Sequence, residues 1–67
     1  MQFKLKDEFI KLDQLLKACD VVYSGGQAKE YLATHQVLVN GEEENRRGKK
    51  IRVGDVVETE DLRIEIQ

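Results

Sequence analysis

The residues best suited to chemistry in this chain of 67 residues are cations gathered in one short stretch. Five of the seven residues in Arg46–Arg52 are positively charged, and none is negatively charged. Cations that converge without an intervening acid suit a phosphate backbone, because neutralising its charges releases condensed counterions. The alternative for a basic run of this kind is a solvated loop that only keeps the protein soluble. The stretch predicts contact with a polyanion.

Two adjacent glycines, Gly25 and Gly26, form the second candidate site. They lie at the expected start of a helix, where each costs roughly 1 kcal/mol relative to alanine. Close packing against another helix, or simple tolerance of glycine at a capped helix end, would explain the pair. Equally, bare backbone amides at a helix N-terminus bind anions and leave room for a phosphate to approach. Because neither Walker spacing nor a Gly-x-Gly-x-x-Gly run is present, a phosphate bound here is expected to belong to a polymer backbone.

Three lysines outside the basic run are candidates to extend it. Lys29 is expected near the exposed start of the same helix, on the side of the basic run, and Lys11 and Lys17 lie in an earlier helical segment. Asp13 precedes Lys17 by one helical turn, so we expect an intrahelical ion pair for Lys17. Lys11 and Lys29 are therefore the lysines assigned to the basic surface.

Catalytic and metal-binding chemistry finds no support in the residue pattern. His35 is the only histidine and Cys19 the only cysteine, and no carboxylate spacing completes a metal site around them. Ser24 is committed to a helix cap and has no base with an orienting partner. We expect no catalytic residue, no metal and no cofactor. The four aromatic residues are expected to pack in the core instead of forming a base-stacking surface: Phe3, Phe9, Tyr23 and Tyr31.

Composition restricts the class of protein further. The formal net charge is -2, which alone argues weakly against a nucleic-acid partner, but the charge is polarised along the chain. Residues 24–52 carry six basic and four acidic groups, and residues 53–67 carry one and five. No apolar run could span a bilayer, no secretory signal is visible and a single cysteine cannot form an internal disulfide, so a cytoplasmic protein is expected.

The element expected to carry much of this chemistry runs from Ser24 to Gly41. Ser24 and Gln27 have the spacing of a capping box, in which the hydroxyl takes the amide of Gln27 and the Gln27 side chain reaches back to the amide of Ser24. One helical stripe follows at Ala28, Tyr31, Leu32 and His35. His35 is expected to end the helix with a positive φ. A strand at 37–39 then leads into an Asn40-Gly41 hairpin turn.

The remaining segments predict a small α+β domain over residues 1–67. A stripe at Leu12, Leu15, Leu16 and Cys19 predicts a first helix from about Lys11 to Cys19. Alternation predicts an edge strand at 1–5, and a hairpin whose strands start at Val56-Val57 and continue at 62–66. Residues 21–23 are expected to join the core, and 42–44 to form at most an exposed return strand. The expected fold is two short packed helices on a small, mostly antiparallel sheet.

Four stretches in this order resemble the S4-type, or alpha-L, RNA-binding domain. They are Phe9–Lys17, Ser24–Lys29, Val37–Gly41 and Ile51–Val57, and the resemblance covers about residues 9–58. The Gly-Gly-Gln-Ala-Lys version is most similar to small stand-alone bacterial S4-domain proteins of the YaaA and YbcJ type. The resemblance implies a helix pair and a bent sheet that present a basic surface to structured ribosomal or transfer RNA, by shape and backbone contacts.

This sequence departs from the family pattern at several positions. In the family an arginine commonly stands at Lys11 and at Lys29, and a Ser-Arg pair stands at Ser24-Gly25. Lysine keeps the charge without the bidentate fork, whereas Gly25 removes a cation. The family's glycine at the helix-to-strand corner is His35 here, which favours a structural role for His35.

Together these arguments predict a non-catalytic, monomeric RNA-binding protein that binds ribosomal RNA or a ribosome-assembly particle and no membrane. A ribosomal or assembly protein is a further candidate partner. The predicted RNA-binding residues are Lys11, Ser24, Gly25, Gly26, Gln27, Lys29, Asn40, Arg46, Arg47, Lys49, Lys50 and Arg52. The rival hypothesis is a protein-interaction adaptor that docks through the acidic residues 42–44 and the acidic tail, or through a sheet edge.

Overall fold

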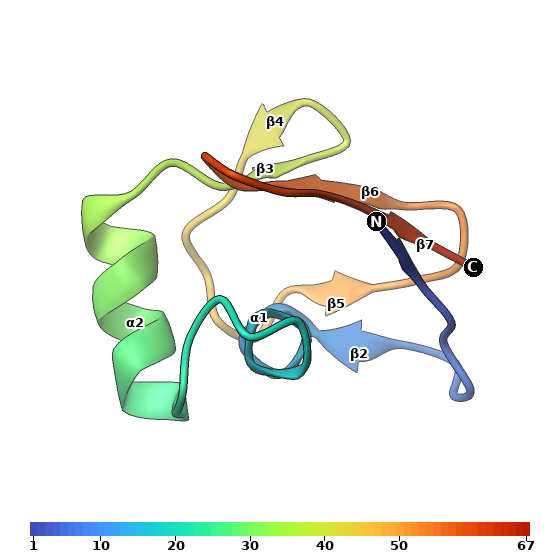
Figure 1. Cartoon of the computed structure of the whole chain (residues 1–67), viewed down its shortest axis with the longest axis horizontal. Coiled ribbons are helices and arrows are strands. Elements are labelled where there is room, and N and C mark those ends of the chain that lie inside the picture. The colour runs from blue at the N-terminus through green and yellow to red at the C-terminus, as the bar shows by residue number, and fades with distance from the viewer.

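A computed structural model describes all 67 residues, Met1–Gln67, as two helices and seven short strands (Figure 1). The helices are α1 (Leu12–Ala18) and α2 (Gly25–Thr34). The strands are β1 (Gln2–Phe3), β2 (Ile10–Lys11), β3 (Leu38–Val39), β4 (Glu42–Glu43), β5 (Lys50–Ile51), β6 (Val56–Glu58) and β7 (Arg63–Ile66). The predicted α+β class is confirmed, and neither helix is long and apolar enough to cross a membrane.

The strands form two sheets. The larger has five strands in the order β1-β7-β6-β3-β4, and only its β1–β7 pair is parallel, so the expected antiparallel character and the edge position of β1 are confirmed. A separate antiparallel ribbon, β2–β5, was not predicted. Figure 1 shows the larger sheet across the top, with α2 at one side and α1 and the ribbon below.

One apolar core lies between the helices and the larger sheet. It comprises twelve buried residues, none of them polar: Leu12, Leu15, Leu16, Val22, Ala28, Leu32, Val37, Val39, Ile51, Val57, Ile64 and Ile66. The buried residues of α1 and α2 all come from the predicted helical stripes, and Cys19 and Tyr31 pack against the core. The stripe of α2 is wrong at its last position, because His35 is exposed. The outward faces of both helices are left free to carry charge.

The hairpin turn at Asn40-Gly41 forms as predicted. Both residues have positive φ, 52° at Asn40 and 84° at Gly41, as a two-residue turn between twisted strands requires. The Asn40 side chain also donates to the Asp55 carboxylate (3.0 Å) and accepts the Val56 N–H (2.9 Å). These bonds tie the turn to the next one, at Gly54-Asp55, where Gly54 has a φ of 95°.

Two local predictions about α2 are wrong in detail. The N–H of Gln27 donates to Ser24 Oγ at 3.1 Å as expected, but the Gln27 side chain accepts the N–H of Tyr23 rather than that of Ser24. His35 does end the helix, but its φ of -126° is extended, since the chain passes directly into the strand direction. Its ring stacks on Tyr31 with centroids 4.3 Å apart.

Two predictions about side-chain partners also fail. Tyr23 is 83% exposed instead of contributing to the core, because only Val22 of its segment is buried. Asp13 makes no ion pair with Lys17; its carboxylate caps the N–H of Gln14 at 2.8 Å. Lys17 is therefore exposed and free of the partner expected for it.

Candidate nucleic-acid interface

The backbone of the basic loop, residues 44–49, is fastened to the start of α1. Helix α1 begins after Lys11 without a side-chain cap. Instead, the N–H of Leu12 donates to the carbonyl of Lys49 (2.8 Å), and the N–H of Asp13 donates to the carbonyl of Arg47 (3.0 Å). These carbonyls satisfy N–H groups that have no partner within the helix. The cations of the loop therefore project from a fixed base.

The loop also reaches the start of α2. One terminal nitrogen of Arg47 lies 3.4 Å from the carbonyl oxygen of Gly25, a long hydrogen bond between exposed groups. Beside it, Gly25 lines a shallow hollow with Asp13, Gln14 and Lys17 of α1. The structure thus brings the two candidate sites, the basic loop and the glycine pair, next to each other.

The glycine pair is not explained by packing inside the protein. A Cβ atom added to Gly25 would meet nothing within 4 Å, and one added to Gly26 would meet only Ser24 Oγ at 4.0 Å. Neither glycine has a positive φ. The close-packing explanation is therefore wrong. The first turn of α2 is open to a ligand approaching from solvent.

The β2–β5 ribbon places two lysines side by side. Lys11 of β2 lies directly opposite Lys50 of β5, and both side chains are exposed. Like charges at directly opposite positions of an antiparallel pair are destabilising. An anion bound between the two would relieve this repulsion.

Phe9 holds two cations of this surface in place, a role that the sequence analysis missed. The Lys50 ammonium nitrogen lies 4.9 Å from the centre of its ring, and the Arg52 guanidinium carbon lies 5.6 Å from it. Both distances are typical of cation–π contacts. The β2–β5 pairing brings Phe9 and Arg52 together, and no local pattern in the sequence signals that pairing.

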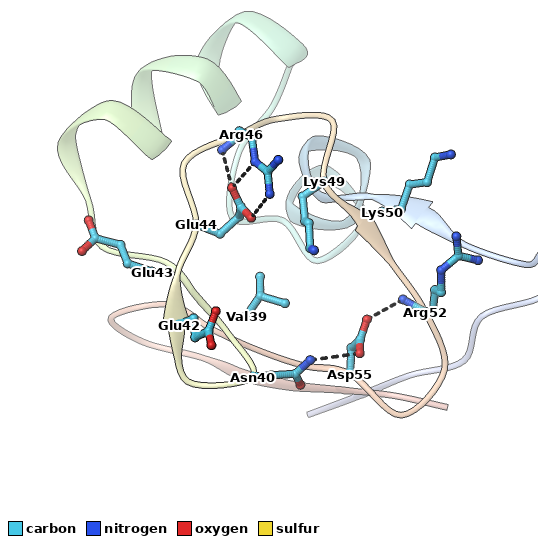
Figure 2. A pocket seen from close by; sticks show the side chains of 10 residues that line it. All are labelled: Val39, Asn40, Glu42, Glu43, Glu44, Arg46, Lys49, Lys50, Arg52 and Asp55. Carbon is cyan, nitrogen blue, oxygen red and sulfur yellow. Dashed lines mark hydrogen bonds and ion pairs between the residues drawn. The ribbon is translucent and has the colours of Figure 1, made fainter.

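An open hollow next to the ribbon is lined by basic residues and a glycine. Its lining residues are Arg46, Gly48, Lys49, Lys50 and Arg52. Figure 2 shows the four cations of this lining in the adjoining pocket, with Lys50 and Arg52 directed away from Glu42, Glu43 and Glu44 on its other side. The fourth acidic residue of that pocket, Asp55, lies beside Arg52 and accepts its backbone N–H at 2.8 Å. The basic surface thus has an acidic border along β4.

Arg46 differs from the other cations of the run because it already has a carboxylate partner. Its Nε donates to one oxygen of Glu44 (2.9 Å), its Nη2 donates to the other (3.0 Å), and its backbone N–H donates to the first (3.0 Å). Figure 2 shows this fork. The hydrogen bonds from Arg46 lower the pKa of Glu44 to about 2. No acidic residue lies within Arg46–Arg52 in the sequence, but in the folded protein Glu44 neutralises the charge of Arg46.

The Glu44–Arg46 pair predicts an acid-dependent contribution to stability. Because the pKa of Glu44 lies well below the ordinary value of 4.5, the pair contributes fully above that value and is lost as pH falls toward 2. Denaturant unfolding of a Glu44→Gln variant should therefore show lower stability than wild type at neutral pH and a vanishing difference near pH 2. Glu43→Gln, which removes a nearby charge but no ion pair, serves as the control.

Four other predicted site residues occupy different positions. Ser24, Gln27 and Asn40 use their side chains for the internal hydrogen bonds described above. Lys29 is exposed on α2, one turn after Gly25, and no hydrogen bond or ion pair joins it to the loop. Lys17, for which an ion pair with Asp13 was expected, lines the same hollow as Gly25.

Comparison with known proteins finds a family model and a curated relative that match most of the sequence. A family model described as the S4 domain matches residues 3–67. A protein of Bacillus subtilis (strain 168), named probable ribosome maturation protein RlbA, is 60% identical over 53 residues. The aligned region covers 79% of this chain and 75% of that relative.

Proposed function

The chain belongs to the S4 domain family, and from this premise we propose that it is a non-catalytic RNA-binding protein that acts in ribosome maturation. Its ligand is structured ribosomal RNA, free or within an assembling ribosomal particle. The name of the Bacillus relative supports a role in ribosome maturation. The cations around the β2–β5 ribbon support RNA as the ligand.

The observation that carries the proposal is the Lys11–Lys50 pair with its neighbours. A folded protein of net charge -2 keeps two lysines opposite each other and adds Lys49 and Arg52 beside them. Such an arrangement is costly in isolation and favourable once phosphates neutralise it. A phosphate backbone is therefore the ligand that best fits this surface.

The predicted residues take different roles in this proposal. Phosphates contact five exposed cations and the half-exposed Lys49, on the ribbon, the loop and the neighbouring helices: Lys11, Lys29, Arg47, Lys49, Lys50 and Arg52. Gly25 and Gly26 offer backbone N–H groups to a phosphate, whereas Ser24, Gln27 and Asn40 support the elements that carry the site. Arg46 contributes less than its neighbours because Glu44 competes with RNA for its guanidinium.

The salt dependence of binding tests the proposal. Neutralising about four phosphates gives a slope of log affinity against log salt near -3 to -4, and thus roughly a hundredfold loss of affinity between 50 and 200 mM salt. Titration of purified bacterial ribosomal RNA at several salt concentrations measures this slope. Binding that is unaffected by salt would contradict a phosphate-contacting surface.

A second candidate function has one observation in its favour. Strand β4 is a sheet edge that pairs only with β3, and both of its glutamates are exposed. A protein partner could add a strand there, which would make the chain an adaptor. Co-sedimentation with ribosomal particles that survives ribonuclease treatment would favour the adaptor, and loss of co-sedimentation would favour RNA.

A further inference from the structure

We propose that Tyr23 stacks against one unpaired base of the bound RNA, beside the phosphate site at Gly25 and Gly26. This inference rests on the proposed RNA-binding function and narrows the ligand to RNA with at least one unpaired nucleotide next to the contacted backbone. It assigns a role to an aromatic residue that the fold itself does not use.

The exposure of Tyr23 is the first observation. Three large apolar residues remain exposed, and Tyr23 is the most exposed of them at 83%, against 62% for Val53 and 56% for Met1. Tyr31, Phe3 and Phe9 are all at least half-buried or packed against the core or cations. Tyr23 therefore leaves its ring in water, although a buried aromatic ring stabilises a small core considerably.

The second observation is that the backbone beneath the ring is held in place. The N–H of Tyr23 donates to the side-chain oxygen of Gln27, and the N–H of Gln27 donates to Ser24 Oγ. The residue is thus tied to the first turn of α2 by a closed pair of hydrogen bonds. Because the backbone of Tyr23 is already fixed, a ligand that orders the ring costs side-chain entropy but little further backbone entropy.

The third observation is what lies around Gly25, two positions after Tyr23 in the chain. Tyr23 is two residues from Gly25, so their Cα atoms are at most about 7 Å apart. Arg47 donates to the Gly25 carbonyl, and Lys17 lines the hollow next to it. No side chain at 25 or 26 obstructs this surface. An exposed aromatic residue two positions from open amides, at a helix start that Arg47 contacts, suits one nucleotide, whose base stacks while its phosphate is neutralised.

A protein ligand fits the same surface less well. Its apolar side chain could cover Tyr23, but Arg47 and Lys17 at Gly25 and the open amides of α2 would then each need an acidic group placed by the partner. An RNA strand supplies phosphate next to every base. The local combination of charges and ring therefore favours RNA.

Three variants at position 23 test the inference, with purified bacterial ribosomal RNA as the probe. Tyr23→Ala and Tyr23→Leu should weaken binding roughly five- to 150-fold, the range measured for loss of one stacked base. Tyr23→Phe, which keeps the ring, should bind like wild type. Because stacking displaces no counterions, the slope of log affinity against log salt should be the same in all four proteins.

A perfectly paired RNA duplex is the second probe, because it offers no free base. Tyr23→Ala should bind the duplex as wild type does. If Tyr23→Ala or Tyr23→Leu binds ribosomal RNA with the affinity of the wild type, the stacking proposal is overturned, but the proposed RNA-binding function is not. Failure of the wild type to bind ribosomal RNA would overturn the proposed function as well. Equal thermal unfolding midpoints confirm that the variants are folded.

Discussion

Replacing Arg47, Lys50 and Arg52 with glutamate should weaken binding of ribosomal RNA at least a hundredfold and leave the protein folded. All three side chains are exposed, and none has a carboxylate partner to lose. Hydrogen bonds to charged groups contribute about 1.5–3 kcal/mol each, and 1.4 kcal/mol is a factor of ten in affinity. Repulsion between phosphate and each new carboxylate adds to the loss. Titration with labelled RNA measures the affinity, and circular dichroism reports the fold.

A matched control separates a local site from net charge. Lys4, Lys6 and Arg63 are also exposed and lie outside the basic loop and the β2–β5 ribbon. Arg63 pairs with Glu65 at 3.1 Å, but an exposed pair of this kind contributes little to stability, and circular dichroism checks the fold of this variant too. Their replacement by glutamate produces the same change in net charge and should reduce affinity far less. Equal losses in the two triple variants would mean that long-range charge, and not this surface, determines binding. Arg46 is left unchanged because reversing it would place two glutamates together and disturb the loop.

Replacing Gly25 and Gly26 with alanine should move stability and RNA binding in opposite directions. Alanine at two open helical positions should raise the free energy of unfolding by about 1–2 kcal/mol in total, because glycine loses more backbone entropy on folding. The added Cβ atoms occupy the space through which a phosphate would approach the N–H groups. We therefore expect RNA affinity to fall roughly tenfold or more, as for the loss of one charge-assisted hydrogen bond.

The control for this variant is Thr34→Ala at the other end of α2. The Thr34 hydroxyl bonds to the Glu30 carbonyl (2.9 Å), a local contact that competes with regular helix geometry, so alanine there should also raise or preserve stability. It lies far along the helix from Gly25 and should leave RNA binding unchanged. Denaturant unfolding and RNA titration are measured on both. If the double alanine variant is more stable and binds RNA normally, the glycines do not contact phosphate.

The parts of this molecule that sequence predicts well are those determined over a few residues. The stripe at Leu12, Leu15 and Leu16 requires one helical face to be apolar, and the structure buries that face. Asn40-Gly41 requires positive φ at two positions, and both have it. Such signals depend on local periodicity and local backbone sterics. These local signals were enough to predict the α+β class.

The parts that sequence missed depend on contacts between distant segments. Strands β2 and β5 have two residues each, too few for a periodic pattern, and they pair across most of the chain. That pairing alone places Lys11 opposite Lys50 and sets Phe9 beneath Lys50 and Arg52. The candidate cations were therefore predictable as a set, but their arrangement was not.

Side-chain partners were predicted least well. The spacing of Asp13 and Lys17 permits an ion pair, yet exposed pairs of this kind contribute so little that a nearby N–H can take the carboxylate instead. Conversely, Glu44 lies outside the basic run and was treated as part of an acidic strand. Its position at the start of the loop lets it fold back on Arg46, a geometry that no helical or strand periodicity signals.

The two loop carbonyls that receive the first N–H groups of α1 constrain how this surface can evolve. The Arg47 side chain is exposed and has no carboxylate partner, so substitutions at this position can change the charge of the loop at little cost to the fold. An inserted or deleted residue would shift the carbonyls of Arg47 and Lys49 away from Leu12 and Asp13 and loosen the helix that supports the core. Preference for one RNA over another should therefore diverge among relatives through changes of residue type, while the length of this loop stays the same.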